Sequence, residues 1–237
     1  MQFSQETPIR RNKYLIFDVE TTGLIPKSSS NQLNVPNLNI YPYILQLSFV
    51  LYDMTAQTVI TKYDSYISVD HKVVISDMIT SLTGITHEQC QRVGRPIIEV
   101  LYEFYKAYIA CDGIVAHNLE FDEKMILIEI ERNREILIKT IPPCLTIFNP
   151  MYEKFRGIDR YCTMKSGTNL CNILIESSYG KSPSKKWPKL IELYKFLFNG
   201  EDVDGMHNSM IDVFACMRCY LKMRHNLTIE MMHISPY

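Results

Sequence analysis

The stretch Tyr14-Leu-Ile-Phe-Asp18-Val-Glu20-Thr-Thr-Gly-Leu24 decides the fold of this chain. It opens with an apolar run, so we predict a buried strand at residues 13–20 that ends in two acids. Residues two apart in a strand project from the same face, which lets Asp18 and Glu20 hold one cation between them. Acids at the end of a buried strand are costly to fold unless cations neutralise them. The stretch therefore indicates a metal site.

A further acid follows a second short apolar strand, which we predict at residues 113–116. The chain continues as His117-Asn-Leu-Glu-Phe-Asp122. Asp122 falls in the first turn of a predicted helix, where the positive end of the backbone dipole favours a charged carboxylate. We therefore expect Asp122 to stay ionised and available to a metal ion, and His117 to shape the site rather than to catalyse.

The last acid belongs to the segment His207-Asn-Ser-Met-Ile-Asp212, which introduces a strong helix pattern at residues 208–223. On a continuous helix His207 and Asp212 would point about 140° apart. Asn208 and Ser209 are good helix caps, and a helix that begins there leaves His207 in the preceding loop. Asp212 is then expected to bind metal, and His207 to act as a movable base.

Four carboxylates with little imidazole and no cysteine form a hard oxygen site, which favours Mg²⁺ or Mn²⁺ over zinc. Two such ions about 4 Å apart can activate a water and stabilise the leaving oxygen of a phosphodiester. Histidine, with an ordinary pKa of about 6.5, is suited to take the proton from that water at neutral pH. The predicted reaction is hydrolysis of a phosphodiester.

Length and composition limit the remaining possibilities. The chain has 237 residues, of which 46% are hydrophobic, so we expect one domain over residues 1–237 with its core at about 13–223. A formal net charge of −1 argues against a protein that coats nucleic acid non-specifically. The odd number of cysteines, seven, favours a reducing compartment. With no apolar signal core at the N-terminus and no membrane-spanning run, we expect an intracellular protein, cytoplasmic or nuclear, without a membrane partner.

The alternation of strands and helices predicts an α/β sandwich with a mixed sheet. Further strands are predicted at residues 43–52 and 57–69, and further helices at residues 96–110, about 121–134 and 187–198, the last opened by Trp187-Pro188. Residues 24–42 read as an inserted loop, and residues 141–186 show no clear period.

Taken together and in order, the three acid-bearing segments resemble the three motifs of the DnaQ-like (DEDDh) 3'-5' exonuclease family. They have its Asp-x-Glu-Thr-Thr-Gly-Leu, His-Asn-x-x-Phe-Asp and His-x-x-x-x-Asp forms. The resemblance extends from about residue 14 to residue 221 and includes Leu82-Thr-Gly-Ile-Thr86, Cys162-Thr-Met164 and Lys186-Trp-Pro-Lys-Leu190. It implies an RNase H-like three-layer sandwich, with a mixed five-stranded sheet flanked by helices.

The same resemblance implies roles for individual residues. Asp18, Glu20, Asp122 and Asp212 would hold two Mg²⁺ ions, which Mn²⁺ can replace, and His207 would be the general base. The spacing of His207 and Asp212 separates the chain from the tyrosine subclass of the family.

Contacts with the terminal nucleotide are also implied. Family members hold it with the residues after the strand acids, so Thr21 and Leu24 are expected contacts, with Leu24 as a wedge beneath the 3' base. Ile85 would face the base from the other side, and Asn118 and Phe121 would shape the pocket.

The resemblance implies a 3'-5' exonuclease that removes nucleoside 5'-monophosphates from a single-stranded or frayed DNA 3' end. An exoribonuclease with the same site is an alternative, because recognition of the 2'-hydroxyl depends on pocket contacts that the sequence does not place. A non-catalytic subunit that binds nucleic acid or a polymerase is another, although the complete set of acids and base favours an enzyme. Since no polymerase domain is attached, proofreading would need a polymerase or repair partner in trans.

One basic run, Lys181 with Lys185, Lys186 and Lys189, surrounds the single tryptophan, Trp187. The lysines fit a solvated loop and helix start as well as they fit a phosphate contact. Trp187 itself is typical of a packing anchor, and stacking on a base is the alternative.

Overall fold

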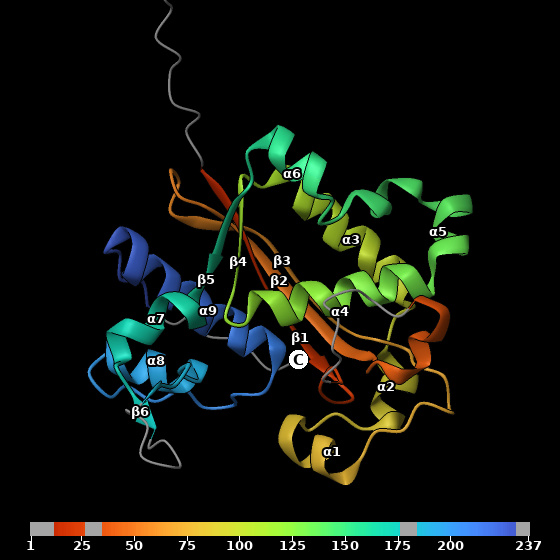
Figure 1. Ribbon diagram of the computed structural model, residues 1–237, viewed down its shortest axis with the longest axis horizontal. Helices are drawn as coiled ribbons and strands as arrows, with labels where there is room; N and C mark the ends of the chain where they lie inside the picture. Colours follow the sequence, from red (N-terminus) through yellow and green to blue (C-terminus); the bar gives the residue numbers. More distant parts are fainter. Residues whose placement is uncertain (1–11, 27–34, 176–183, 231–237) are drawn as a thin grey trace, which may run out of the picture.

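A five-stranded sheet with the strand order β3-β2-β1-β4-β5 forms the middle of the molecule (Figure 1). The computed structural model describes residues 12–26, 35–175 and 184–230. The strands are β1 (Lys13–Thr21), β2 (Ile44–Asp53), β3 (Thr58–Tyr66), β4 (Gly113–Ala116) and β5 (Asp159–Cys162). The pairs β1/β2 and β2/β3 are antiparallel, whereas β1/β4 and β4/β5 are parallel. The mixed five-stranded sheet implied by the sequence is therefore confirmed.

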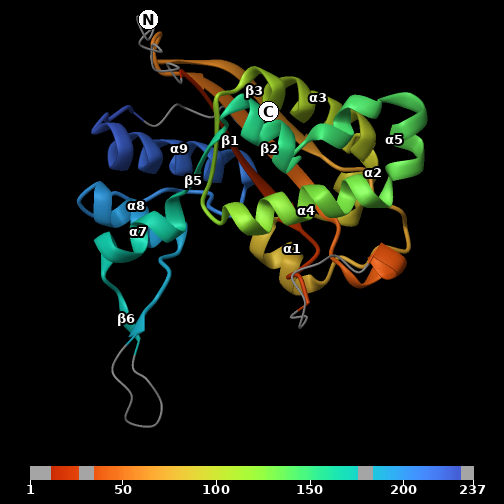
Figure 2. The ribbon, with the colours of Figure 1, turned by 45° about the horizontal axis from the view of Figure 1, so that its top comes forward.

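Helices cover both faces of this sheet. They are α1 (Asp77–Thr83), α2 (His87–Val93), α3 (Ile97–Ala110), α4 (Leu119–Arg132), α5 (Arg134–Thr140), α6 (Pro150–Arg156), α7 (Thr163–Cys171), α8 (Leu190–Leu197) and α9 (Ser209–His225), with the 3₁₀ helices η1 (Val35–Ile40) and η2 (Pro142–Thr146). Two short strands, β6 (Leu174–Ile175) and β7 (Ser184–Lys185), pair with each other outside the main sheet. Figures 1 and 2 show α8 and α9 on one side of the sheet and α3 and α4 on the other, which gives the three-layer sandwich.

The strand β1 supplies both cores because its side chains alternate between the faces. Leu15 and Phe17 lie in the core that includes α3 and α4, and Tyr14 and Ile16 lie in the core that includes α8 and α9. All four side chains are less than 5% exposed, so β1 is buried on both faces. An apolar run without a polar face is what such a strand requires.

Most predicted elements agree with the observed ones. The strand predicted at residues 113–116 is β4 without any shift, and the strand predicted at 13–20 is β1 with one more residue. The last helix begins at Ser209, as its caps predicted. The strand predicted at residues 57–69 ends earlier, at Tyr66, and an isolated bridge between Ile67 and Arg95 continues its line.

Two predicted helix boundaries are wrong. The helix assigned to Trp187-Pro188 begins at Leu190 instead, because Lys189 is its N-cap and the Lys189 N–H donates to Glu192 Oε2 at 2.7 Å. The helix predicted at about 121–134 ends at Arg132. There the chain turns through Asn133 into α5, which the sequence pattern did not separate from α4.

The segment 141–186, which shows no clear period, contains an edge strand of the main sheet. This strand, β5, has four residues and the sequence Asp-Arg-Tyr-Cys, so neither its length nor its polarity predicts a buried element. The predicted loop at 24–42 contains η1 where the structure describes it, and residues 27–34 and 176–183 lie outside the described part of the chain. No helix among the described residues is long and apolar enough to span a membrane.

A buried ion pair ties α4 to the segment before β2. Arg132 Nη1 donates to Glu129 Oε1 at 2.6 Å, and the two side chains are 9% and 5% exposed. The guanidinium lies 3.7 Å from the ring centre of Tyr43. It also donates to the backbone oxygens of Leu38, Tyr41 and Pro42. Burial raises the pKa of Glu129, and the charge of Arg132 opposes that rise, so the pair depends on both partners.

We expect Arg132→Met to lower the free energy of unfolding by about 3–5 kcal/mol, because it leaves a buried carboxylate without its partner. The matched control is Arg134→Met, since Arg134 pairs with Glu131 at the same spacing but the two side chains are 52% and 23% exposed. That change should cost about 0–1 kcal/mol. Urea unfolding followed by circular dichroism measures both, and equal midpoints for the two variants would contradict the assignment.

Candidate active site

The three acid-bearing segments converge at one edge of the sheet. The strands β1 and β4 are parallel, so their carboxyl ends lie at the same edge. Asp18 and Glu20 lie at the end of β1, and Asp122 lies in the first turn of α4, which follows β4 (Figure 1). Asp212 lies in the first turn of α9, which packs against β1 and β2. Parallel pairing and two helix starts therefore bring four acids together from distant parts of the chain.

The two acids of β1 face α9. Asp18 and Glu20 share their side of the strand with Tyr14 and Ile16, which pack against α8 and α9. Val19 points the other way and is 6% exposed in the opposite core. Both acids keep part of their surface exposed.

The start of α9 is anchored directly on the sheet. Ser209 Oγ donates to the backbone oxygen of Asp18 at 2.8 Å, and the Ser209 N–H donates to Gln46 Oε1 at 3.3 Å. Asn208 Oδ1 caps the helix by accepting from the backbone N–H groups of Met210 and Ile211. These bonds fix the helix end, and therefore Asp212, relative to β1.

His207 precedes this cap and lies outside the helix. Its backbone has a φ of 69°, in the left-handed region, and its side chain is exposed. One ligand atom each from Glu20, His207 and Asp212 lie within 4.8 Å of one another. The loop thus holds an exposed imidazole over two of the four acids.

The donor set fits a divalent cation. Asp122 Oδ2 and Asp212 Oδ1 are buried and accept no hydrogen bond from any described residue. Asp122 is 2% exposed and Asp212 is 8% exposed. Buried carboxylate oxygens without a donor are costly unless something positive reaches them. Oxygen ligands of this kind suit Mg²⁺ or Mn²⁺.

Burial raises the pKa values of all four acids. Burial raises the pKa of Asp18 to about 7, against a hydrogen bond from Ser209 that lowers it. Burial and the charges of Asp18 and Asp212 raise the pKa of Glu20 to about 9. The pKa values of Asp122 and Asp212 also lie well above the ordinary range, because of burial and then the charge of Asp18. Without a cation, the cluster favours protonated acids.

This result corrects one expectation. The first turn of α4 was expected to keep Asp122 ionised, but burial and the neighbouring acids outweigh the helix dipole in the metal-free protein. Asp122 is available to a metal ion only if that ion displaces a proton.

His117 connects the site to two other segments. Its Nε2 is 3.0 Å from the backbone oxygen of Pro188, and its Nδ1 is 2.9 Å from Thr163 Oγ1. A carbonyl oxygen only accepts, so Nε2 carries the proton and donates. Burial lowers the pKa of His117 to about 4, and the ring is neutral at physiological pH. Both nitrogens are engaged, which agrees with a role in shaping the site.

The expected nucleotide contacts differ in accessibility. Leu24 is 85% exposed, whereas Thr21 is 8% exposed and its hydroxyl donates to the Gly23 backbone oxygen at 2.7 Å. Ile85 is 1% exposed within the core, so its side chain offers no surface to a base in this conformation. Asn118 and Phe121 line a pocket of about 250 Å³ beside the acids.

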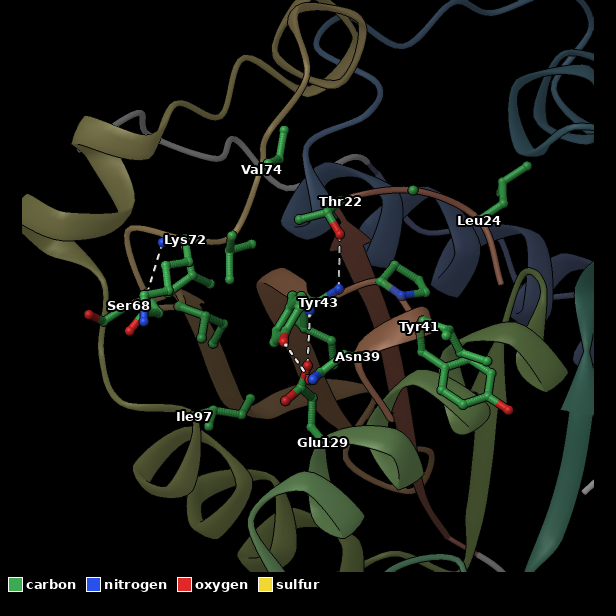
Figure 3. A pocket seen from close by; sticks show the side chains of 18 residues that line it. Thr22, Leu24, Asn39, Tyr41, Tyr43, Ser68, Lys72, Val74, Ile97 and Glu129 are labelled. Atoms are coloured by element: carbon green, nitrogen blue, oxygen red, sulfur yellow. Dashed lines mark hydrogen bonds between the residues drawn. The ribbon is translucent and has the colours of Figure 1, made fainter. Parts of the chain in front are cut away.

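A larger hollow, of about 830 Å³, borders the end of β1. Figure 3 shows Thr22 and Leu24 on one side of it and Lys72 and Val74 on the other. Thr22 is fixed by Tyr43, the residue before β2, because Thr22 Oγ1 accepts from the Tyr43 N–H and the Thr22 N–H donates to the Tyr43 oxygen, each at 2.9 Å. None of the four acids lines this hollow, which lies beside the cluster.

Sequence reasoning missed the polar residues of β2 that support the site. Gln46 pairs across the strands with Glu20, and Ser48 pairs with Asp18. Gln46 Nε2 and Ser48 Oγ both donate to Asp64 Oδ1, at 2.8 and 2.7 Å, and Gln46 and Ser48 are fully buried. The available signal was the presence of Gln and Ser inside an otherwise apolar strand.

The fold and the site define a class of protein: an RNase H-like α/β sandwich with acids gathered at the carboxyl edge of the central strands. The family model of RNase_T, described as exonuclease, matches residues 15–220. The chain therefore belongs to the RNase_T exonuclease family, which confirms the family resemblance of the three motifs.

Two curated relatives place this match in context. The PolC-type DNA polymerase III of Streptococcus agalactiae serotype III (strain NEM316) is 30% identical over 146 residues, which are 60% of this chain and 8% of the polymerase. The PolC-type DNA polymerase III of Listeria welshimeri serovar 6b is 31% identical over 167 residues, which are 70% of this chain and 10% of the polymerase. The chain thus spans a tenth or less of these relatives.

Solved structures share the fold. The nuclease domain of 3'hExo, a DEDDh family member bound to rAMP, has a TM-score of 0.58 and 16% identity, covering 95% of this chain and 100% of that chain. Exonuclease I from E. coli, in complex with a dT13 oligonucleotide, has a TM-score of 0.58 and 16% identity, covering 91% of this chain and 42% of that chain.

The raised pKa values set the sign of a pH effect on stability. Folded, metal-free protein keeps protons on acids that the unfolded chain, with carboxyl pKa values of about 4, has already released. The free energy of unfolding should therefore fall as the pH rises from about 4, through about 7 for Asp18 and about 9 for Glu20. Excess Mg²⁺ should reverse this loss, of the order of a few kcal/mol.

Thermal unfolding in EDTA and in MgCl₂, at about pH 5.5 and about pH 8, measures the effect. The increase in Tm caused by Mg²⁺ should be larger at the higher pH. The Asp212→Asn variant removes one acid at constant size and should lose most of that increase. An equal increase in wild type and variant would show that the cation binds elsewhere.

Proposed function

We propose that this chain is a metal-dependent 3'-5' exonuclease that hydrolyses phosphodiester bonds at DNA 3' ends and releases nucleoside 5'-monophosphates. The observation that carries the proposal is the pair of buried oxygens, Asp122 Oδ2 and Asp212 Oδ1, which accept no hydrogen bond from the described residues. Together with Asp18 and Glu20, they form an oxygen cluster that a cation would stabilise. Membership of the exonuclease family gives this cluster its chemistry.

Asp18, Glu20, Asp122 and Asp212 would hold two Mg²⁺ ions, which Mn²⁺ can replace. When bound, such ions activate the attacking water and stabilise the leaving oxygen. His207 accepts the proton of that water, because its ring is exposed on a loop and reaches the same space as Glu20 and Asp212.

Binding of the terminal nucleotide would use the surface next to the acids. Leu24, which is 85% exposed, is suited to lie beneath the 3' base. Thr21, Asn118 and Phe121 would shape the space around the nucleotide. Ile85 is the least accessible of these contacts and would reach a base only after movement of the turn that contains it.

DNA is the proposed substrate because the matched relatives are DNA polymerases. A polymerase or repair partner in trans is proposed for the same reason. The second candidate is an exoribonuclease with the same site, favoured by the fold likeness to a 3'-exonuclease recognising the histone mRNA stem-loop, with a TM-score of 0.59 and 16% identity. A third candidate is a non-catalytic binding subunit, whose function would not change when the acids are replaced. The Asp18→Ala variant described next tests this candidate.

The assignment of roles is tested with a 5'-labelled oligonucleotide, whose products form a ladder if residues leave from the 3' end. We expect Asp18→Ala to abolish Mg²⁺-dependent trimming and His207→Ala to lower kcat by about 10²–10⁴-fold. His71→Ala is the control, because His71 is an exposed histidine whose side chain is 80% accessible. Nuclease activity that is unchanged in either site variant would mean that the site has been misplaced.

Substrate choice is tested with DNA and RNA oligomers of equal length and sequence, each with Mg²⁺, with Mn²⁺ and with EDTA. We expect faster trimming of DNA, and no trimming in EDTA. If RNA is shortened faster, the exoribonuclease alternative replaces the DNA assignment.

A further inference from the structure

A groove next to the acid cluster carries an aromatic ring and two lysines. The pocket of about 250 Å³ is lined by Asn118, Phe121, Lys124, Lys165 and Trp187, among others. Asn118 and Phe121 belong to the start of α4, whose first turn also carries Asp122, so the groove and the acid cluster lie at the same end of this helix. The proposed function assigns Asn118 and Phe121 to the terminal nucleotide and leaves Lys124, Lys165 and Trp187 without a role.

Trp187 is 60% exposed and is the only tryptophan of the chain. It makes no hydrogen bond, ring contact or cation–π contact with the described residues and lies in neither hydrophobic core. A packing anchor would be buried. The ring instead presents a large apolar face to the solvent within a groove.

The backbone that carries this ring is held firmly. The Pro188 oxygen accepts from His117 Nε2 at 3.0 Å, and the Lys186 N–H donates to the Ile173 oxygen at 2.8 Å. Pro188 is itself buried. An exposed ring on a fixed backbone loses little freedom on binding, which favours a preorganised contact.

The charge of the groove suits phosphate. Lys165 Nζ pairs with Glu120 at 2.8 Å, and the hydrogen bond and charge of Lys165, and then the charge of Lys124, lower the pKa of this acid. That pair is exposed, at 50% for Lys165 and 74% for Glu120, so it contributes little and a phosphate can replace the carboxylate. Two cations against one acid leave a local positive charge.

We propose that this groove is a second subsite, in which unpaired nucleotides 5' of the scissile bond stack on Trp187 while Lys124 and Lys165 bind their phosphates. The occupant is a single strand, because a base that is paired does not offer a free face to an aromatic ring. The inference rests on the proposed function, since it extends the substrate of the same active site away from its 3' end.

The single tryptophan allows a direct test on the unmodified protein. In EDTA, an oligo-dT of about twelve nucleotides should quench the fluorescence of Trp187, whereas dTMP, which fills only the terminal position, should not. Absence of quenching by the oligonucleotide, at concentrations that bind in a separate filter assay, would overturn the subsite.

Kinetics with Mg²⁺ supply the second measurement. Loss of one stacked base is expected to raise KM for the oligo-dT about tenfold in Trp187→Ala, with kcat and the KM for a dinucleotide unchanged. Trp187→Phe should retain most of the affinity. Phe155→Ala is the matched control, because Phe155 is 88% exposed on α6, near the opposite end of the sheet (Figure 1). An equal change of KM for the oligonucleotide and the dinucleotide would remove the subsite.

These outcomes separate the two proposals. Quenching by oligo-dT without any cleavage would support the subsite and contradict the exonuclease assignment. Cleavage of oligo-dT with an unchanged KM in Trp187→Ala would leave the exonuclease assignment in place and contradict the subsite.

Discussion

The burial of four neighbouring carboxyl groups at one edge of the sheet is the constraint on which the rest of the structure depends. Burial raises the pKa of Asp18 to about 7 and that of Glu20 to about 9, and one oxygen each of Asp122 and Asp212 accepts no hydrogen bond from the residues that the structure describes. Burying such a cluster lowers the free energy of unfolding, and contacts elsewhere in the fold must offset this loss. Two hydrophobic cores, one on each face of β1, provide those contacts.

Polar bonds on β2 keep the cluster together. Asp64 accepts from Gln46 and Ser48, and Gln46 in turn accepts from the backbone of Ser209 at the start of α9. These bonds fix the helix that carries Asp212 without adding a positive side chain beside the acids. The carboxyl oxygens of the cluster are therefore left for an external cation, which would displace their protons.

The sequence predicted the parts of this protein in which local pattern and tertiary role agree. The strand β1 is apolar because it is buried on both faces, and its terminal acids stand where the strand reaches the edge. The start of α9 followed from Asn208 and Ser209, whose caps act locally. The family followed from three motifs whose order and spacing are specific.

Other features depend on contacts that no local pattern encodes. The strand β5 is short and polar, and only pairing with β4 makes it a strand. The burial of Ile85 is set by the surrounding core, and the raised pKa of Asp122 by acids distant in the sequence. The helix dipole explains why a carboxyl group suits the start of α4. The sequence pattern does not show how far burial of that group opposes its ionisation.

The buried ion pair of Glu129 and Arg132 has a consequence for the acid cluster. Both residues belong to α4, which also carries Asp122, and seven residues of helix separate Asp122 from Glu129 by about 10 Å. Arg132 donates a hydrogen bond to the Tyr41 oxygen before β2 and lies over the ring of Tyr43. The Tyr43 N–H in turn donates to Thr22 Oγ1. Helix α4 thus joins the carboxyl group of Asp122 to the wall of the large hollow, which Glu129 helps to line, so a displacement of one end would be transmitted to the other.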